Sequence, residues 1–236
     1  MKKICIYIGL FIIFLFGCSI IIGRSLIRHI NYNDFISGVT YFSTPIEYVY
    51  NEFKRNKDIF IDDRKINNIE ELIDNSEYVL KIKIKDNPTF YGNGIINNVM
   101  ILDIIKGGND KSIVVGSELK IYDLISYWSG DYINYYGGMT PLNPKNEYIV
   151  FLNKTEHANQ EETYIFSSIR YGHFNISVSD ANVLTDYIQG SLTLQEIMEY
   201  DYVEMNCDSS GYSSCDKYEE NYSKLKKQLL DYMISE

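Results

Sequence analysis

Histidine is the side chain best suited to acid–base chemistry near neutral pH, and the chain contains only three. His157 lies near Glu161 and Glu162, which together could ligate a metal ion. Its polar surroundings favour a hairpin tip instead, because the spacing is not that of a zinc-binding helix. His173 lies in an apolar stretch, which favours a buried structural histidine over a general base. We therefore expect no metal ion, no cofactor and no enzyme, with a metal-assisted hydrolase using His157 or His173 as the alternative.

Acidic side chains are the second set of candidate chemical groups. They occur as an adjacent pair and as a spaced cluster: Asp62 and Asp63, then Glu196, Glu199, Asp201 and Glu204. Paired carboxylates act as acid and base in glycosidases and bind calcium in loops. Neither the spacing of a calcium-binding loop nor a nucleophile motif of the Gly-x-Ser-x-Gly type accompanies them. We expect both groups to be solvated acidic surface.

Aromatic residues crowd the segment from Tyr122 to Met139, which glycines interrupt. Aromatic rings between glycine hinges can stack on sugars or grip a peptide, with a large contact area at low entropic cost. Five of them are candidate binding residues: Tyr127, Trp128, Tyr132, Tyr135 and Tyr136. The other interpretation is that these rings fold over the domain and belong to its core.

Two cysteines near the end of the chain, Cys207 and Cys215, flank a short stretch rich in Ser, Gly and Asp. In an oxidising compartment such a pair closes a disulfide, which stabilises the fold by up to ~2.5 kcal/mol through the unfolded chain. The spacing is not the Cys-x-x-Cys of zinc or redox centres. We predict a Cys207–Cys215 disulfide.

The run from Ile4 to Gly23 contains no charged residue and is long enough, as a helix, to span a bilayer. No small-x-small cleavage site follows it, so we expect a retained, single-pass membrane helix with the C-terminal domain outside the cell membrane. Within the same run, Leu15-Phe16-Gly17-Cys18 resembles a lipobox. Lipid attachment at Cys18 is therefore the alternative anchor.

The elements that would position these residues form a β-rich middle with helices on both sides. Capping patterns predict a helix at about 45–56 and another beginning at Asn68. From Tyr78, apolar residues alternate with lysines, which is typical of a half-buried strand. Further strands are predicted at 59–61, 99–105, 113–115, 119–124, 148–152, 164–169 and 174–178. Helices are predicted at 180–189, after Thr193 and at about 216–234.

Short strands without long helices between them favour an antiparallel barrel or sandwich. Four segments occur in the order of a known barrel: the helix leading into Ser76-Glu77-Tyr78-Val79-Leu80, the strand ending Ile104-Ile105-Lys106-Gly107, Leu142 followed by Tyr148-Ile149-Val150-Phe151-Leu152, and Tyr171-Gly172-His173-Phe174. Over residues 68–178 the chain resembles the netrin/TIMP-type OB barrel, and it is similar to membrane-anchored and lipoprotein domains of low-GC Gram-positive bacteria. The barrel-domain cysteines of the animal members are missing. No inhibitor role and no site residue therefore carries over.

These observations predict a mixed α+β protein with an N-terminal transmembrane helix, an antiparallel OB-like β-barrel with flanking helices, and a helical C-terminal region. Four parts follow along the chain: 1–30, a cytoplasmic stub and membrane anchor; 31–65, a linker and amphipathic helix; 66–178, the OB-like β domain; and 179–236, an acidic helical region.

The net charge of −10 bears directly on the choice of partner. A polyanion would be repelled before any aromatic stacking could help, so we expect no nucleic acid to bind. Besides the membrane, contacted through residues 4–23, we expect a cell-wall or protein partner. The predicted function is non-enzymatic binding or scaffolding at the cell surface. The second alternative is an accessory subunit whose acidic helices dock a basic partner.

Overall fold

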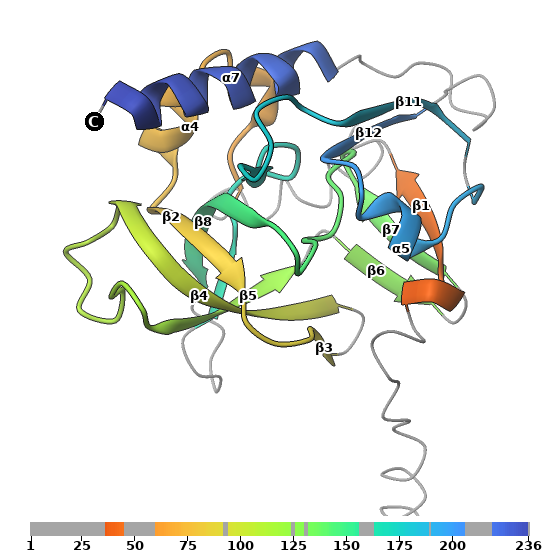
Figure 1. Ribbon diagram of the computed structural model, residues 1–236, viewed down its shortest axis with the longest axis horizontal. Coiled ribbons are helices and arrows are strands. Elements are labelled where there is room, and N and C mark those ends of the chain that lie inside the picture. Colours follow the sequence, from red (N-terminus) through yellow and green to blue (C-terminus); the bar gives the residue numbers. More distant parts are fainter. Residues whose placement is uncertain are drawn as a thin grey trace, which may run out of the picture. The chain divides into compact units, whose positions relative to one another are not determined.

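The computed structural model describes residues 36–44, 60–91, 94–123, 126–129, 132–155, 163–188, 190–205 and 219–235, all within one compact unit, Ile36–Glu236 (Figure 1). None of the helices in these ranges is long and apolar enough to cross a membrane. The apolar run 4–23, the predicted helix at 45–56 and the cysteines Cys18, Cys207 and Cys215 lie outside the described residues. The anchor and the disulfide therefore stay predictions.

Five strands close into a barrel (Figure 1): β2 (Tyr78–Ile84), β4 (Gly94–Lys106), β5 (Glu118–Asp123), β8 (Glu147–Thr155) and β9 (Thr163–Phe166). The ring runs β8–β2–β4–β5–β9 and returns to β8. The prediction of a mixed α+β fold with a barrel is thus confirmed. The expectation of a wholly antiparallel barrel is wrong, because β5 and β9 pair in parallel. A closed ring with an odd number of strands must contain a parallel pairing, since directions cannot alternate all the way round.

The alternation that predicted the first barrel strand is present in β2. Leu80 and Ile82 are fully buried, whereas Lys83 and Lys85 are exposed. Lys81 forms an ion pair of 2.9 Å with Glu147 on β8. The lysine side of β2 therefore faces water and the isoleucine side fills the barrel, as its period of two predicts.

Further strands extend or accompany the barrel. Two of them lengthen its sheet: β3 (Thr89–Tyr91) pairs with β4, and β10 (His173–Asn175) pairs with β8. A separate sheet has the order β1–β7–β6, from β1 (Thr40–Thr44), β6 (Ser126–Ser129) and β7 (Tyr132–Tyr136). A parallel pair joins β11 (Val183–Tyr187) to β12 (Tyr202–Met205).

Helices cover one side of the barrel, where α7 (Glu219–Ser235) passes beside α4 (Ile69–Asn75) (Figure 1). The predicted cap of α4 is present, because the Asn68 side chain accepts from the Glu71 N–H. Their apolar sides join β8 and β10 in one core cluster: Ile66, Ile69, Leu72, Ile73, Val79, Ile149, Phe151, Tyr171, Phe174, Tyr202, Tyr222, Leu225 and Leu229. The one-turn helix α5 (Leu194–Ile197) has the capping box predicted from Thr193 and Glu196, and η2 (Asp63–Lys65) is a short 3-10 turn.

The C-terminal region differs from the prediction. A helix was expected at 180–189, but Val183–Tyr187 is the strand β11. In the register of β11 with β12, Val183 lies opposite Tyr202 and Leu184 opposite Val203. The residue pattern within 180–189 cannot indicate this pairing, because the partner strand lies further along the chain. The strand predicted at 113–115 is a turn, in which Ile113 is buried and Val114 is 53% exposed. Of the strand predicted at 59–61, residues 60 and 61 form no strand either, and residue 59 lies outside the described residues.

Candidate functional site

His173 is the candidate acid–base residue that the structure describes. Its ring is 1% exposed and lies 5.4 Å, between centroids, from the rings of Tyr148 and Phe166. Its Nε2 is 2.8 Å from the Thr140 carbonyl oxygen, and because a carbonyl can only accept, Nε2 carries the proton and Nδ1 is bare. Burial lowers the pKa of His173 to about 4, although the bond to Thr140 and the charge of Asp201 act to raise it. At neutral pH the ring is neutral and out of reach of solvent.

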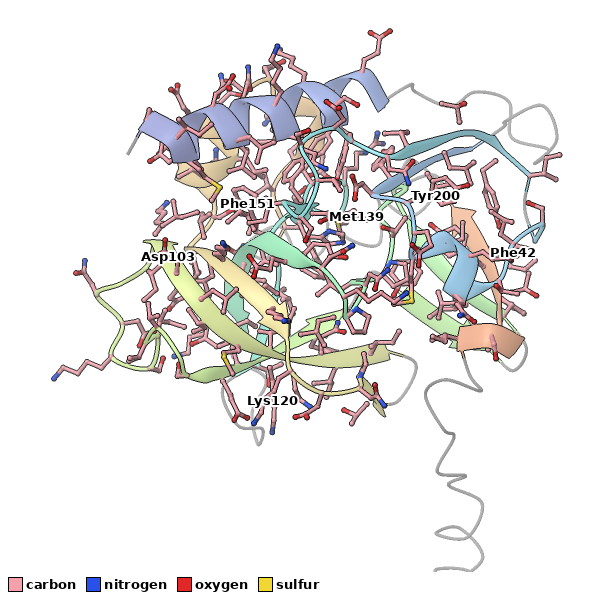
Figure 2. All side chains as sticks on the ribbon, in the orientation of Figure 1. Phe42, Asp103, Lys120, Met139, Phe151 and Tyr200 are labelled. Carbon is pink, nitrogen blue, oxygen red and sulfur yellow. The ribbon has the colours of Figure 1, made fainter. Side chains whose placement is uncertain are left out.

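Thr140 belongs to a connection between β7 and β8 that we call the strap, residues 137–143. Every residue of the strap is buried, and Met139 lies in the interior of the unit (Figure 2). Irregular backbone in such a place needs partners for its polar groups. Its carbonyl oxygens accept hydrogen bonds from residues far away along the chain: Tyr41, His173, Tyr202 and Val203. The strap therefore joins the barrel, the β1–β7–β6 sheet and β12.

Lys226 on α7 and Asp201, just before β12, form an ion pair of 2.8 Å with side chains only 1% and 3% exposed. The Lys226 ammonium also donates to the Asp180 carbonyl, and the Asp201 carboxylate accepts from the Asn182 N–H, both at 2.9 Å. The expectation that Asp201 is solvated is therefore wrong. A buried pair with these additional bonds has a structural role, since neither charge reaches solvent.

A second buried carboxylate, Asp63, was also expected at the surface, and it is 3% exposed. Its Oδ1 accepts from the Ser168 hydroxyl at 2.6 Å, and its Oδ2 has no hydrogen-bond partner among the described residues. Burial raises the pKa of Asp63 to about 6, although the hydroxyl, the charge of Arg170 and the backbone N–H groups of Ile169 and Arg170 act to lower it. This carboxyl group therefore titrates close to neutral pH.

These buried groups have no route to a substrate. A general base must come within hydrogen-bond reach of the proton that it abstracts. His173, Asp63 and Asp201 are each less than 5% exposed. Within the described ranges, no group of three His, Cys, Asp or Glu side chains could hold a metal ion. The other candidate ligands, His157 with Glu161 and Glu162, lie outside those ranges.

The predicted aromatic residues lie on β6 and β7, and the structure separates two of them. Tyr132 is 41% exposed. Tyr135 is 1% exposed, stacks on Tyr41 at 5.7 Å and donates its hydroxyl to Asp123 at 3.1 Å. Tyr135 is therefore a core residue, as the second interpretation of this segment predicts, and only Tyr132 is shown at the surface.

Phe42 on β1 was not among the predicted residues, yet its ring lies edge-on to Tyr132 with centroids 5.3 Å apart. Phe42, which Figure 2 labels, also pairs in register with Asn134, which is partly exposed. We call Phe42, Tyr132 and Asn134 the aromatic face. The register of β6 sets Tyr127 opposite Asn134 and Trp128 opposite Ile133, and that of β1 sets Thr44 opposite Tyr136.

The spacing of residues in the sequence indicates where some of these side chains lie, although it was not used in the predictions. Lys226 follows Tyr222 by four residues and precedes Leu229 by three, which sets it on the apolar side of α7. Tyr132 and Asn134 alternate with Ile133 and Tyr135, a period of two that separates the surface from the core. No comparable local signal identifies Asp63.

Comparisons with known proteins do not assign the chain to a family. A scan against protein-family models found no match, and a search of curated proteins found none that is significantly similar.

Proposed function

We propose that this protein is a membrane-anchored, extracytoplasmic binding protein in which an OB-like barrel supports a ligand surface on the aromatic face. The exposed Tyr132 ring beside Phe42 carries the proposal, because His173, Asp63 and Asp201 are buried in structural contacts. Cell-wall glycans and peptides are the ligand classes that such rings recognise, by stacking and edge contacts. In this proposal the protein binds its ligand and does not catalyse a reaction on it.

The order of strand pairings supports an OB-like barrel. The barrel strands in chain order are β2, β4, β5, β8 and β9. The pairings around the ring are β2 with β4, β4 with β5, β5 with β9, β9 with β8, and β8 with β2. The third and fifth of these strands, β5 and β9, pair in parallel. This is a Greek-key ring of five strands, which is the description of the OB fold. The resemblance to netrin/TIMP-type domains implies the same architecture.

The apolar run 4–23 supports the membrane location, with the retained helix as the proposed anchor and lipid attachment at Cys18 as the alternative. Both anchors place the barrel at the outer face of the cell membrane. The burial of His173 argues against a hydrolase that uses its ring, since an imidazole 1% exposed cannot contact a substrate.

The test uses the full chain in detergent micelles, titrated with soluble cell-wall glycan fragments and, separately, with their peptides. Trp128, the only tryptophan, reports through its fluorescence, and calorimetry gives the affinity. We expect binding of one class, and we expect Tyr132→Ala to weaken it about tenfold, in line with the ~1.4 kcal/mol of a lost ring contact.

Two variants control this experiment. Tyr132→Phe keeps the ring and is expected to retain most of the affinity, whereas Val114→Ala removes an exposed apolar side chain from the turn before β5 and should change nothing. Equal affinities of Tyr132→Ala and the wild-type protein would remove the aromatic face from the proposal. No binding of either ligand class would remove the proposed function.

A further inference from the structure

The strap is an irregular segment whose backbone is tightly constrained along its length. It begins with Gly137 and Gly138, whose φ angles are +77° and +87°, a region in which L side chains are strained. A Cβ on Gly138 would come within 2.6 Å of the Val203 carbonyl oxygen. The turn thus places the chain directly against β12.

The other end of the strap is held from two sides. The Asn143 N–H donates to the Tyr148 hydroxyl at 2.7 Å, and its amide donates to the Met198 carbonyl at 3.0 Å. In the middle, the Thr140 hydroxyl donates to the Tyr200 carbonyl at 2.7 Å. These bonds join the strap to the barrel on one side and to residues 198–203 on the other.

His173 supplies one bond to the middle of the strap, beside the one that the Gly172 N–H donates to the Met139 sulfur at 3.1 Å, and the Nδ1 atom of His173 is the weak point. Nδ1 is buried and has no hydrogen-bond partner among the described residues. A second N–H at this atom would be a buried donor without an acceptor, which is strongly unfavourable.

The charged and titratable groups around this ring are few. Asp201 acts on it electrostatically from the segment before β12 and is itself paired with Lys226 of α7. Tyr148 of β8 presents its ring, and the Tyr222 hydroxyl of α7 donates to the His173 carbonyl at 3.4 Å. Because the Asp201 charge is already engaged by Lys226, it is poorly placed to stabilise an imidazolium as well.

We propose that the strap is an acid-released latch: uptake of one proton by His173 favours a state in which residues 137–143 leave the barrel while the barrel itself stays folded. The proton passes from solvent to Nδ1, and no covalent bond changes. In the released state the imidazolium is hydrated, and both of its N–H groups donate to water. The strap continues directly from β7, so its release also frees the end of the β1–β7–β6 sheet.

The size of the effect follows from the two protonation equilibria. An imidazole that titrates near 6.5 when hydrated and near 4 when buried makes the opening constant about 20-fold larger at pH 5 than at pH 7. Local openings of this kind are measured by amide hydrogen exchange.

Hydrogen exchange of the full chain in detergent micelles, corrected for the intrinsic rates, tests the proposal at pH 5, 6 and 7. We expect the opening constant of peptides spanning 137–143 to rise about 20-fold toward pH 5, while that of peptides spanning 78–84 in β2 stays constant. His173→Gln retains an N–H for the Thr140 carbonyl and cannot take up the proton, so its strap should lose the pH dependence. The same dependence in His173→Gln, or parallel opening of both peptides, would overturn the latch.

A measurement on the wild-type protein covers the case in which His173→Gln does not fold. The ring carbon signals of the histidines, of which there are only three, are followed by NMR through the same pH range. The latch predicts a His173 signal that keeps its neutral shift in the closed state, with exchange broadening toward pH 5. A signal that titrates near 6.5 in a protein whose strap stays protected would disprove it.

Discussion

Asp63 and Asp201 are both buried carboxylates, and the molecule stabilises them in different ways. Asp201 contacts an ammonium group at 2.8 Å and an N–H at 2.9 Å. Asp63 has a hydroxyl at 2.6 Å, backbone N–H groups and the charge of Arg170 around it, yet one of its oxygens has no hydrogen-bond partner among the described residues. The pKa of Asp63 is accordingly raised to about 6. A carboxylate in a close ion pair depends on its charged partner, whereas a buried carboxylate whose pKa is raised by burial can lose its charge by taking up a proton.

The largest expected effect comes from removing the partner of Asp201. Lys226→Met keeps the length and apolar stem of the side chain but leaves a buried, uncompensated carboxylate. We expect a loss of about 3–5 kcal/mol in the free energy of unfolding, measured by urea denaturation at pH 7.

Lys227→Met is the matched control, since Lys227 is the exposed neighbour on the same helix, and it should change stability by less than about 0.5 kcal/mol. The double variant Lys226→Met with Asp201→Asn should recover part of the loss, because the buried charge is gone. Equal stabilities of Lys226→Met and Lys227→Met would show that the Lys226–Asp201 ion pair does not stabilise the fold.

The second effect is a pH dependence with a defined sign. The folded-state pKa of Asp63 is raised, so its contribution to stability is present below about 3.8 and is lost as pH rises through about 6. The folded-state pKa of His173 is lowered, so its contribution is present above 6.5 and is lost as pH falls toward 4. Between pH 4 and pH 6.5 the two contributions oppose each other.

Asp63→Asn removes one of these two contributions. Relative to wild type, the free energy of unfolding of Asp63→Asn should fall by about 2.4 kcal/mol between pH 7 and pH 4, because only the wild type gains from protonating this group. Denaturant titrations at pH 4, 5, 6 and 7 measure the difference, with the exposed Asp74→Asn as control. A difference that does not change with pH would show that Asp63 is not titrating in this range.

The two carboxylates also show how far the sequence alone can be interpreted. The period of two in β2 and the apolar spacing of α7 are local, and both elements were predicted within a few residues. Asp63 is held by Ser168 and Asp201 by Lys226, partners that only the folded chain brings together. Charge pattern alone therefore predicted solvent exposure for both, incorrectly.

The same limit explains the errors in secondary structure and in the aromatic segment. The β11 strand exists through its pairing with β12, so residues 180–189 were wrongly predicted as a helix. Tyr132 and Tyr135 were grouped because the segment was interpreted as a loop, and strand alternation separates them. The burial of His173 was predicted from its apolar neighbours, whereas its bond to the strap depends on tertiary structure.

The smallest effect concerns the hydroxyl that stabilises Asp63. Ser168→Ala removes the hydroxyl that donates to Asp63 Oδ1 and that also accepts from the Tyr171 N–H, which lies 2.7 Å from the Ser168 Oγ. We expect a loss of about 1.5–3 kcal/mol at pH 7, the range for a hydrogen bond to a charged group, and a smaller loss at pH 4, where Asp63 is protonated. The NMR titration midpoint of the Asp63 carboxyl carbon should move upward, because a donor that favoured the charged form is gone.

Ser76→Ala separates the effect of charge from that of simple burial. The Ser76 hydroxyl is also buried, and it bonds to the neutral Leu72 carbonyl and the Ser167 hydroxyl at 2.8 and 2.7 Å. A bond between neutral groups contributes about 0.5–1.5 kcal/mol, so Ser76→Ala should cost less than Ser168→Ala at pH 7 and should show no change with pH. If the loss of stability in each variant is the same at pH 4 as at pH 7, the Ser168 hydroxyl acts through packing alone. If only Ser168→Ala depends on pH, its hydroxyl helps to set the pH at which Asp63 takes up its proton.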